Sequence, residues 1–220
     1  MTTCPLCSSP LIRHYHRDRL REYLQCEDCL LVSVPREFHL TPEAEKAEYD
    51  KHRNSPDDEG YRRFLSRTTV PLFERLPDGS VGLDFGCGPG PAISQMATEA
   101  GFSMSDFDPY YFDDRELLSR QYDFVTMTEV IEHVARPDRL LGTLDKLLKP
   151  GAILAIMTKR VIDREAFVRW HYKNDPTHIC FYSEETFAWI GRKMGWNLQV
   201  IDNDVVFFVR LRRVLKNTPP

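Results

Sequence analysis

The sequence predicts an α/β fold: a mostly parallel sheet with helices on both faces and an antiparallel closing hairpin, preceded by a small cysteine-rich unit. Three observations support this prediction. Apolar segments of strand length alternate with amphipathic segments of helix length from residue 81 onward. A glycine-rich turn lies at the end of the first of these strands, in VGLDFGCGPG at residues 81–90. Four of the six cysteines lie within the first 29 residues.

The composition is that of a soluble globular protein. The 220 residues are 42% hydrophobic and 28% charged, with a formal net charge of −4. That charge argues against a protein whose main task is to coat nucleic acid. No apolar run approaches the length of a membrane span, and the first residues do not resemble a signal peptide. We therefore expect a cytoplasmic protein that has no membrane partner.

Residues 1–38 are predicted to form a zinc ribbon. CPLC and CEDC are separated by eighteen residues, which contain two short strand-like segments of a hairpin. In a reducing compartment, paired CxxC elements favour a metal site over disulfides. Four thiolates at this spacing suit tetrahedral zinc, which replaces the core that so short a segment cannot build. The predicted ligands are Cys4, Cys7, Cys26 and Cys29.

Residues 39–80 are predicted to form a helical bridge or lid. Thr41 is a plausible N-cap and Pro42 fits the first helical position. The helical pattern breaks at residues 54–60 and resumes over residues 61–76. Two interpretations stay open: a lid that brings His52, Asn54 and Tyr61 over a bound ligand, or a solvated charged helix.

Residues 81–215 are predicted to form the main domain. Ser183 is placed to cap the last helix, and Gly101 and Gly195 are placed to end helices. Lys149, Pro150 and Gly151 are predicted to turn the chain between a helix and a strand. The expected strands cover residues 81–85, 102–108, 122–127, 152–158, 197–202 and 205–211, and the expected helices cover residues 91–100, 137–148 and 184–194.

The spacing of the glycine turn leaves its nucleoside ligand open. A P-loop needs a Gly-Lys-Ser/Thr ending, which this turn lacks. Gly86, Gly88 and Gly90 give GxGxG, whereas a dinucleotide site is typical of GxGxxG. An acidic residue about twenty positions further on can bind a ribose, and Asp106 and Asp108 lie there.

Four blocks of sequence together resemble a known family. LDFGCGPG, the acidic end of the next strand, YDFVTMTEVIEHV and LLKPGAILAIMT resemble the class I S-adenosylmethionine-dependent methyltransferases over residues 81 to about 210. NSPDDEGYRRFLSR, FDPYY and WHYKNDPTHICFYSEETF are similar to a bacterial subgroup that joins an N-terminal zinc ribbon to this fold. The resemblance implies a Rossmann-like sheet and S-adenosyl-L-methionine as cofactor.

The resemblance also implies roles for single residues. The three glycines let the backbone pass under the methionine and adenosine. Asp84 would orient the ammonium or structure the turn. Asp108, or Asp106, would bind the ribose diol with Pro109 beside the cofactor, although Asp108 followed by Pro109 is also typical of a plain turn. Glu129 and the backbone of Met127 and Thr128 are expected beside the cofactor, or else in an ordinary helix start.

The sequence departs from the family in the segment that usually contacts adenine. Only thirteen residues separate the second strand from YDFVTM, where the family usually has a helix, another strand and a polar adenine contact. We expect Tyr110, Tyr111 and Phe112 to form a stacking wall instead.

Methyl transfer from a sulfonium is an in-line displacement, so the enzyme aligns the nucleophile and can remove its proton. The candidate bases are His133, His171, Asp175 and His178, each of which has a packing role as its alternative. The resulting hypothesis is a methyltransferase acting on the O, N or C atom of a small molecule, as a monomer or homodimer.

Two alternatives remain. One is an RNA or protein methyltransferase whose ribbon docks the macromolecule through Arg13, Arg17, Arg19 and Arg21, which nearby acidic residues offset. The other is a catalytically degenerate binding module, which only the missing block supports.

Overall fold

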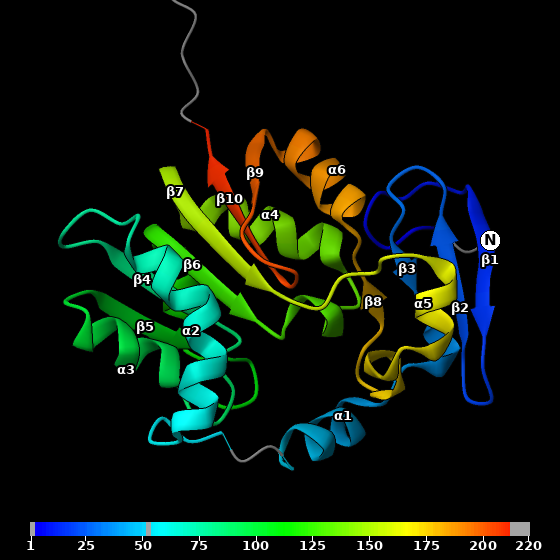
Figure 1. Ribbon diagram of the computed structural model, residues 1–220, viewed down its shortest axis with the longest axis horizontal. Coiled ribbons are helices and arrows are strands. Elements are labelled where there is room, and N and C mark those ends of the chain that lie inside the picture. Colours follow the sequence, from blue (N-terminus) through cyan, green and yellow to red (C-terminus); the bar gives the residue numbers. More distant parts are fainter. Residues whose placement is uncertain (1–2, 52–53, 212–220) are drawn as a thin grey trace, which may run out of the picture.

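The centre of the molecule is a six-stranded sheet. Residues 3–51 and 54–211, which the computed structural model describes, form this sheet, a second sheet of four strands, and the helices around them (Figure 1). The strand order in the main sheet is β5-β4-β6-β7-β10-β9. The bounds are β4 Val81–Phe85, β5 Ser103–Phe107, β6 Tyr122–Thr128, β7 Leu148–Met157, β9 Trp196–Val200 and β10 Val205–Arg210.

The sheet is mostly parallel, as predicted. Parallel pairing joins β4 to both β5 and β6, and β6 to β7. Strand β10 inserts antiparallel between β7 and β9, which makes the expected closing hairpin. The carboxyl ends of β4, β5 and β6 therefore meet at one edge of the sheet, where ligands of such folds bind.

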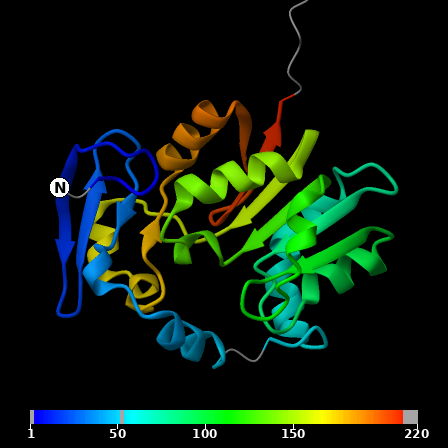
Figure 2. The same cartoon turned by 180° about the vertical axis from the view of Figure 1, so that it is seen from behind.

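Helices cover both faces of the main sheet. The helices α2 (Glu59–Phe73) and α3 (Ala92–Glu99) pack on one face, and α4 (Pro137–Leu147) and α6 (Glu184–Met194) belong to the other (Figure 2). Strand β10 shows the alternation that this arrangement requires. Phe207 is buried with Leu72 of α2, and Phe208 is buried on the opposite face with Phe187 of α6.

The predicted helix ends are confirmed. The Thr41 hydroxyl accepts a hydrogen bond from the amide of Ala44 at the start of α1 (Pro42–Tyr49), and Ser183 caps α6 in the same way. Gly195 ends α6 with a positive φ of 69°. Asp58, which was not singled out, caps α2 through the amide of Tyr61.

The main sheet also lacks, within the described residues, the helix and strand that the family usually has between the second strand and YDFVTM. Strand β5 is the last strand on its side of the sheet, and among the described residues no strand pairs with its outer edge. The segment that follows forms a bridge between Asp108 and Phe112, and then the 3₁₀ helix η2 (Arg115–Ser119) before β6 begins.

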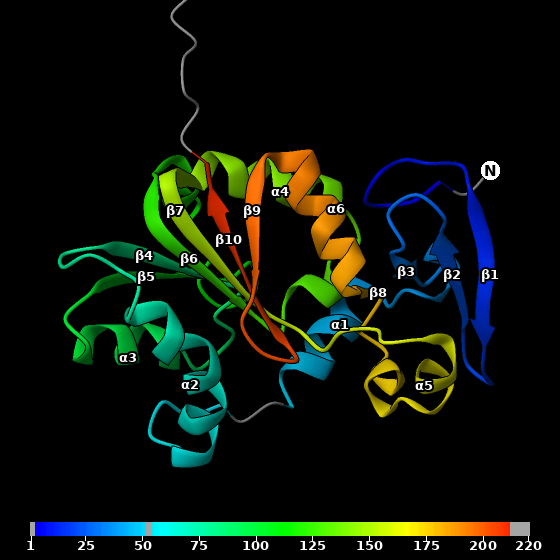
Figure 3. The same ribbon diagram turned by 45° about the horizontal axis from the view of Figure 1, so that its top comes forward.

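The second sheet joins the N-terminal unit to the main domain. Its order is β1-β2-β3-β8, with β1 Ile12–Arg17, β2 Glu22–Cys26, β3 Val32–Ser33 and β8 Cys180–Phe181. The pairing of Val32 with Phe181 adds a strand from far along the chain to the N-terminal hairpin. Strand β8 lies between the N-terminal strands and α6 (Figure 3), and one apolar core runs from Tyr23 to Leu144 of α4.

Some predictions differ from the structure. Lys149, Pro150 and Gly151 lie within β7 rather than in a turn, because Leu148 already pairs with Tyr122. The short helices were not predicted, because they contain too few residues for a periodic pattern. These are η1 Arg36–Phe38, η2 Arg115–Ser119, η3 Ile131–His133, η4 His171–Asn174 and α5 Arg164–Arg169. His52 and residues 212–215 of the predicted main domain lie outside the described residues.

Candidate functional site

A cavity of about 760 Å³ lies at the carboxyl ends of β4, β5 and β6. Its floor is the glycine turn, its sides are the segments that follow β5 and β6, and its cover comes from α1 and the start of α2. Nine of the residues predicted for cofactor binding or catalysis line it. They are Gly86, Gly88, Asp108, Pro109, Thr128, Glu129, His133, Asp175 and His178.

The first two glycines of the turn have the conformation that favours glycine. Gly86 and Gly88 have φ values of 86° and 65°. A Cβ atom on Gly86 would lie 2.5 Å from Cγ2 of Val130, so this position has no room for a side chain. A Cβ atom on Gly88 would meet no atom within 4 Å. Since Gly88 lines the cavity, a side chain there would project into the space for a ligand.

Gly90 has no room for a side chain because the bridge packs against it. A Cβ atom there would lie 2.0 Å from the carbonyl oxygen of Asn54. The backbone of the bridge therefore rests directly on the third glycine of the turn. Asn54 and Tyr61 both line the cavity, whereas Gly90 does not.

Asp84 lies buried beneath the turn. It is 3% exposed, and its Oδ1 accepts a hydrogen bond of 2.7 Å from the Thr126 hydroxyl. Burial raises the pKa of Asp84 to about 7. Asp84 is absent from the residues that line the cavity, and its carboxyl links β4 to β6 through Thr126.

Asp108 organises the loop after β5. Its Oδ2 accepts from the amide of Gly88 at 3.1 Å, and its Oδ1 accepts from the amide of Tyr110 at 2.8 Å. The carboxylate thus ties the glycine turn to the adjacent loop while still facing the cavity. Asp106 instead accepts a hydrogen bond from the Ser94 hydroxyl at 2.8 Å and does not line the cavity.

Phe112, one of the three residues predicted to form a stacking wall, is 38% exposed and does not line the cavity. The other two, Tyr110 and Tyr111, do line it. Their hydroxyls donate to α1 and its C-cap: Tyr110 to Glu45 at 2.8 Å and Tyr111 to Asp50 at 2.7 Å. Burial raises the pKa of Tyr110 to about 12, so its hydroxyl keeps its proton.

The bridge covers the cavity and is not merely a solvated helix. Tyr49 of α1 and Tyr61 of α2 both line the cavity. The ring of Tyr49 lies 5.4 Å from that of His133, edge to face, and 5.7 Å from that of Tyr110. Burial raises the pKa of Tyr61 to about 12, and the charges of Asp84, Cys87 and Glu129 add to this.

The end of β6 contributes two residues to the wall. Thr128 and Glu129 line the cavity, but the Met127 side chain is fully buried in the core and absent from the wall. Glu129 has a positive φ of 52°, and its amide donates to the carbonyl of Met157 at 2.8 Å. Burial raises the pKa of Glu129, and the neighbouring charge of Glu132 raises it further.

Two histidines meet at the other end of the cavity. The rings of His133 and His178 lie 4.7 Å apart, and both residues line the wall with Asp175. Burial lowers the pKa of His178 to about 4, so its ring is neutral. Burial opposes the charge of Asp175, but hydrogen bonds from Thr177 lower its pKa overall. His171 is exposed, lies outside the wall, and has its Nε2 3.3 Å from Nζ of Lys159.

Segment 171–178, which contains the cavity residues Asp175 and His178, is held in place by the N-terminal hairpin. The Arg21 guanidinium is 7% exposed and donates to four backbone carbonyls. These belong to Lys173, Asp175 at 2.8 Å, and Pro176 and His178 at 3.0 Å each. Sequence analysis placed Arg21 in a basic patch, and the structure corrects this.

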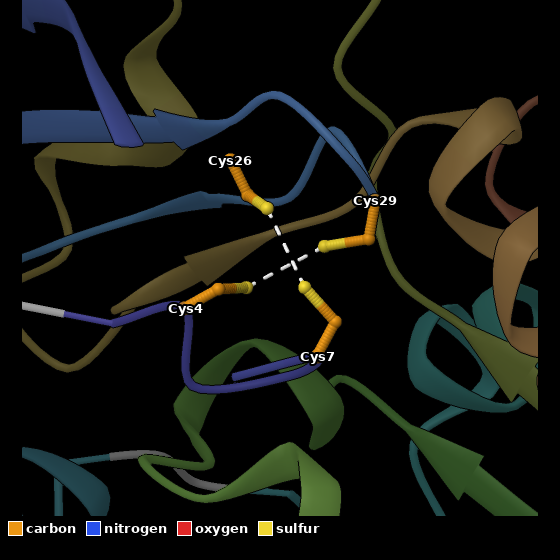
Figure 4. Close-up of side chains that lie close together, drawn as sticks. All are labelled: Cys4, Cys7, Cys26 and Cys29. Atoms are coloured by element: carbon orange, nitrogen blue, oxygen red, sulfur yellow. Dashed lines mark hydrogen bonds between the residues drawn. The ribbon is translucent and has the colours of Figure 1, made fainter. Parts of the chain in front are cut away.

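The four predicted metal ligands converge at the base of the hairpin (Figure 4). Sγ of Cys4 lies 3.4 Å from that of Cys29, and Sγ of Cys7 lies 3.5 Å from that of Cys26. Thiolates bound about 2.3 Å from a tetrahedral ion would be about 3.8 Å apart, so this cluster fits such an ion after a small expansion.

Arg21, Tyr49 and Glu132 belong to the site but were not predicted from the sequence. Glu132 is fully buried, next to His133 and the Tyr172 hydroxyl. One signal was present, because Glu132 is an acidic residue within the apolar run of TEVIEHV. No comparable signal marked Arg21, since its partners are backbone atoms more than 150 residues away.

The chain resembles known proteins. A family model described as a methyltransferase domain matches residues 57–200. One similar solved structure is a SAM-dependent methyltransferase from Archaeoglobus fulgidus, with a TM-score of 0.52 and 21% identity over 70% of this chain and 75% of that chain. No curated protein sequence matches the chain significantly.

Two further solved structures share the fold. A methyltransferase in complex with the Haloferax volcanii Trm112 methyltransferase activator has a TM-score of 0.51 and 14% identity over 78% of this chain and 97% of that chain. An O-methyltransferase family protein from Burkholderia thailandensis has a TM-score of 0.50 and 16% identity over 80% and 62%. None of the helices within the described ranges has the length and apolar character to cross a lipid bilayer.

The buried position of Arg21 leads to a first prediction. We expect Arg21→Met to lower the free energy of unfolding by about 3 kcal/mol, because it leaves buried carbonyls without donors. Amide exchange should accelerate most at Thr177 and His178. Arg19→Met is the matched control, since Arg19 is exposed in the same turn and should change stability by less than about 0.5 kcal/mol. Equal effects of the two variants would contradict the assigned role.

Proposed function

Since this chain belongs to the methyltransferase-domain family and is an S-adenosylmethionine-dependent methyltransferase, we propose that its methyl acceptor is a small molecule bound at the histidine end of the cavity. The observation that carries this proposal is the size and lining of the cavity. The cavity holds about 760 Å³, and residues of α1 and the start of α2 line one side of it. Its size is within the range of sites for small ligands.

The two ends of the cavity suit different parts of the reaction. The glycine turn, Asp108 and the Tyr110–Tyr111 pair would hold the adenosine, with stacking by the tyrosines in place of the family's usual adenine contact. The methionine part would lie near Tyr61 and Glu129. The acceptor would then approach from the side of His133, Asp175 and His178, all of which line the wall.

The reaction needs alignment more than chemical activation. The acceptor attacks the methyl carbon in line with the departing sulfur, so the wall must hold the two reactants about 3–3.5 Å apart. Carboxylates beside the cavity favour the positive sulfonium by Coulomb attraction. In this chain, Glu129 lines the cavity and would supply such a carboxylate.

The macromolecular alternative has less support. Of the four arginines proposed to dock a macromolecule, Arg21 is buried against segment 171–178. The exposed residues Arg13, Arg17 and Arg19 remain for a partner. The degenerate-module alternative loses its one argument, because Tyr110 and Tyr111 rebuild the wall where the missing block would lie.

We also propose that the cysteine cluster binds one zinc ion per chain. Its four thiols are free, and cysteine-only tetrahedral sites are typical of structural zinc. The ion would hold the hairpin that carries Arg21, and through Arg21 it would fix segment 171–178. Six free cysteines agree with a reducing compartment such as the cytoplasm.

The experiment that tests the proposed acceptor class uses labelled cofactor. Cell extract depleted of endogenous S-adenosylmethionine is incubated with the protein and methyl-labelled cofactor, then separated into RNA, protein and small molecules. We expect the label in the small-molecule fraction. Label confined to RNA or protein would replace this proposal with the macromolecular one.

A second prediction concerns the glycine turn. We expect Gly88→Val to weaken binding of S-adenosylhomocysteine at least about 100-fold, or about 3 kcal/mol, because the side chain enters the cavity. Isothermal titration calorimetry measures this affinity.

Gly101→Val is the matched control for Gly88→Val. Gly101 also has a positive φ, 88°, and open space at its Cβ position, but it lies outside the cavity wall. Both variants carry a similar backbone strain of about 1–2 kcal/mol. Only Gly88→Val should lose the ligand, and normal binding by that variant would exclude the glycine turn from the cofactor site.

A third prediction concerns zinc. Protein purified without chelator should contain one zinc per chain by elemental analysis, with Cys4 and Cys26 protected from thiol reagents. Chelation should lower the melting temperature and slow methyl transfer, because β8 and segment 171–178 depend on the hairpin. A zinc-free preparation whose Cys4 and Cys26 react at once would contradict the assignment.

A fourth prediction concerns His133. We expect His133→Ala to reduce kcat at least about tenfold, or about 1.4 kcal/mol in the barrier, while the affinity for S-adenosylhomocysteine changes less than about threefold. The reason is that His133 lies at the acceptor end of the cavity. Unchanged turnover with the acceptor found above would leave His133 a packing role.

A further inference from the structure

Three side chains with metal-ligating atoms converge at the acceptor end of the cavity. One ligand atom each from Glu132, His133 and His178 lies within 4.8 Å of the others. We propose that these residues bind a divalent first-row transition metal ion that holds the methyl acceptor. This proposal rests on the proposed function only for the identity of the bound acceptor, because the ion site is defined by the side chains alone.

Glu132 has an unsatisfied oxygen inside the protein. The residue is 0% exposed, and its Oε1 accepts a hydrogen bond from the Tyr172 hydroxyl. Oε1 also lies 3.9 Å from Nε2 of His133. Oε2 has no hydrogen-bond partner among the residues that the structure describes. A buried carboxylate oxygen without a partner is costly, and a bound cation would satisfy it.

His178 has the orientation of a metal ligand. Its Nδ1 lies 2.8 Å from the backbone carbonyl of Tyr172. A carbonyl only accepts, so Nδ1 carries the proton and Nε2 keeps its lone pair. Metal-binding histidines commonly donate their second ring nitrogen to a carbonyl or carboxylate in this way.

The surroundings of the cluster hold two carboxyl groups, whose ionised forms carry negative charge. The single hydroxyl proton of Tyr172 serves two carboxylates, since its oxygen lies 3.0 Å from Oε2 of Glu129 as well as in contact with Glu132. Lys159 lies over the Tyr172 ring, with Nζ 5.4 Å from the centroid. In the parts of the chain described here, no lysine or arginine forms an ion pair with Glu129 or Glu132. A divalent cation would balance this charge.

The distances and the donor types select the kind of ion. Two ligands about 2.1 Å from one ion lie about 3 to 4 Å apart, and the ligand atoms here lie within 4.8 Å of one another, so the cluster must contract by up to about 1–2 Å to hold the ion. Two imidazoles and one carboxylate favour manganese, iron, cobalt or zinc over magnesium or calcium, which prefer oxygen ligands. His133 and His178 line the cavity, so the remaining coordination positions face the acceptor.

The ion defines a substrate class, which is a hydroxylated small molecule. The acceptor oxygen would bind the ion, which lowers the pKa of its O–H group so that the proton leaves to water. The oxygen then forms a bond to the methyl carbon of S-adenosylmethionine. The carbon–sulfur bond breaks with its electron pair going to sulfur, giving the methyl ether and S-adenosylhomocysteine. In this arrangement His133 is a ligand and does not act as the base.

The test is a titration of the full chain, with zinc in its cysteine cluster, using Mn²⁺ alone as the probe. Manganese is a poor competitor for four thiolates, so it reports on the nitrogen and oxygen site. The electron paramagnetic resonance signal of free Mn²⁺ measures the bound fraction. We expect one Mn²⁺ per chain, with an affinity at least tenfold weaker in Glu132→Gln and in His178→Ala.

The control is His171→Ala, which removes an exposed histidine from the same segment, outside the cavity wall, and should leave Mn²⁺ binding unchanged. Calorimetry with S-adenosylhomocysteine verifies that each variant is folded. Absence of Mn²⁺ binding in the wild type, or equal binding by the wild type and both ligand variants, would overturn the metal site. Because this titration contains neither cofactor nor acceptor, either result leaves the proposed methyl transfer to be judged by its own experiment.

Discussion

The geometry of the cavity at His133 and His178 depends on one buried guanidinium. Arg21 reaches from the turn between β1 and β2 to four carbonyls of segment 171–178. Asp18 sets its position by accepting the amides of Leu20 and Arg21 at 2.8 Å each. A planar guanidinium with five donors can satisfy several carbonyls at once, which a lysine cannot do with the same geometry. The N-terminal unit therefore serves as a clamp on the cavity.

The clamp explains why the cysteine cluster and the main domain share one core. Segment 171–178 has little regular structure of its own, yet it positions Asp175 and His178 in the cavity wall. Strand β8 follows this segment directly and completes the N-terminal sheet through the pairing of Val32 with Phe181. The segment is thus fixed by Arg21 and, beyond its last residue, by a strand pairing. Removing either restraint would loosen the same end of the cavity.

The end of the cavity beside the glycine turn is built in a different way. Strand β5 ends the sheet, so no further strand supports the segment that follows it. The hydroxyls of Tyr110 and Tyr111 instead donate to Glu45 and Asp50, and the bridge becomes the missing wall. The close approach of the Asn54 carbonyl to Gly90 also packs the bridge against the glycine turn. The closely packed bridge therefore supports the segment that the shortened sheet leaves without a neighbouring strand.

The sequence predicted what local patterns determine. Alternating apolar runs located the strands of the main sheet, and capping residues such as Thr41, Ser183 and Gly195 marked helix ends. The four cysteines were found by spacing alone. Burial of Arg21, the strand pairing of Phe181 and the contact between Tyr49 and His133 all join distant segments. No local pattern encodes such contacts, so Arg21 was assigned to the surface by its charge.

Electrostatics links the two ends of the cavity. Burial raises the pKa of Asp84, Glu129 and Glu132, so each carboxyl holds a proton more firmly than it would in water. A cation that enters this region favours the ionised form of these groups and so takes the place of a proton. S-adenosylmethionine brings a sulfonium and an ammonium, whereas its demethylated product keeps only the ammonium. In the proposed function, these carboxyls would therefore attract the reactant more strongly than the product, which would favour release of the product once the methyl group has left.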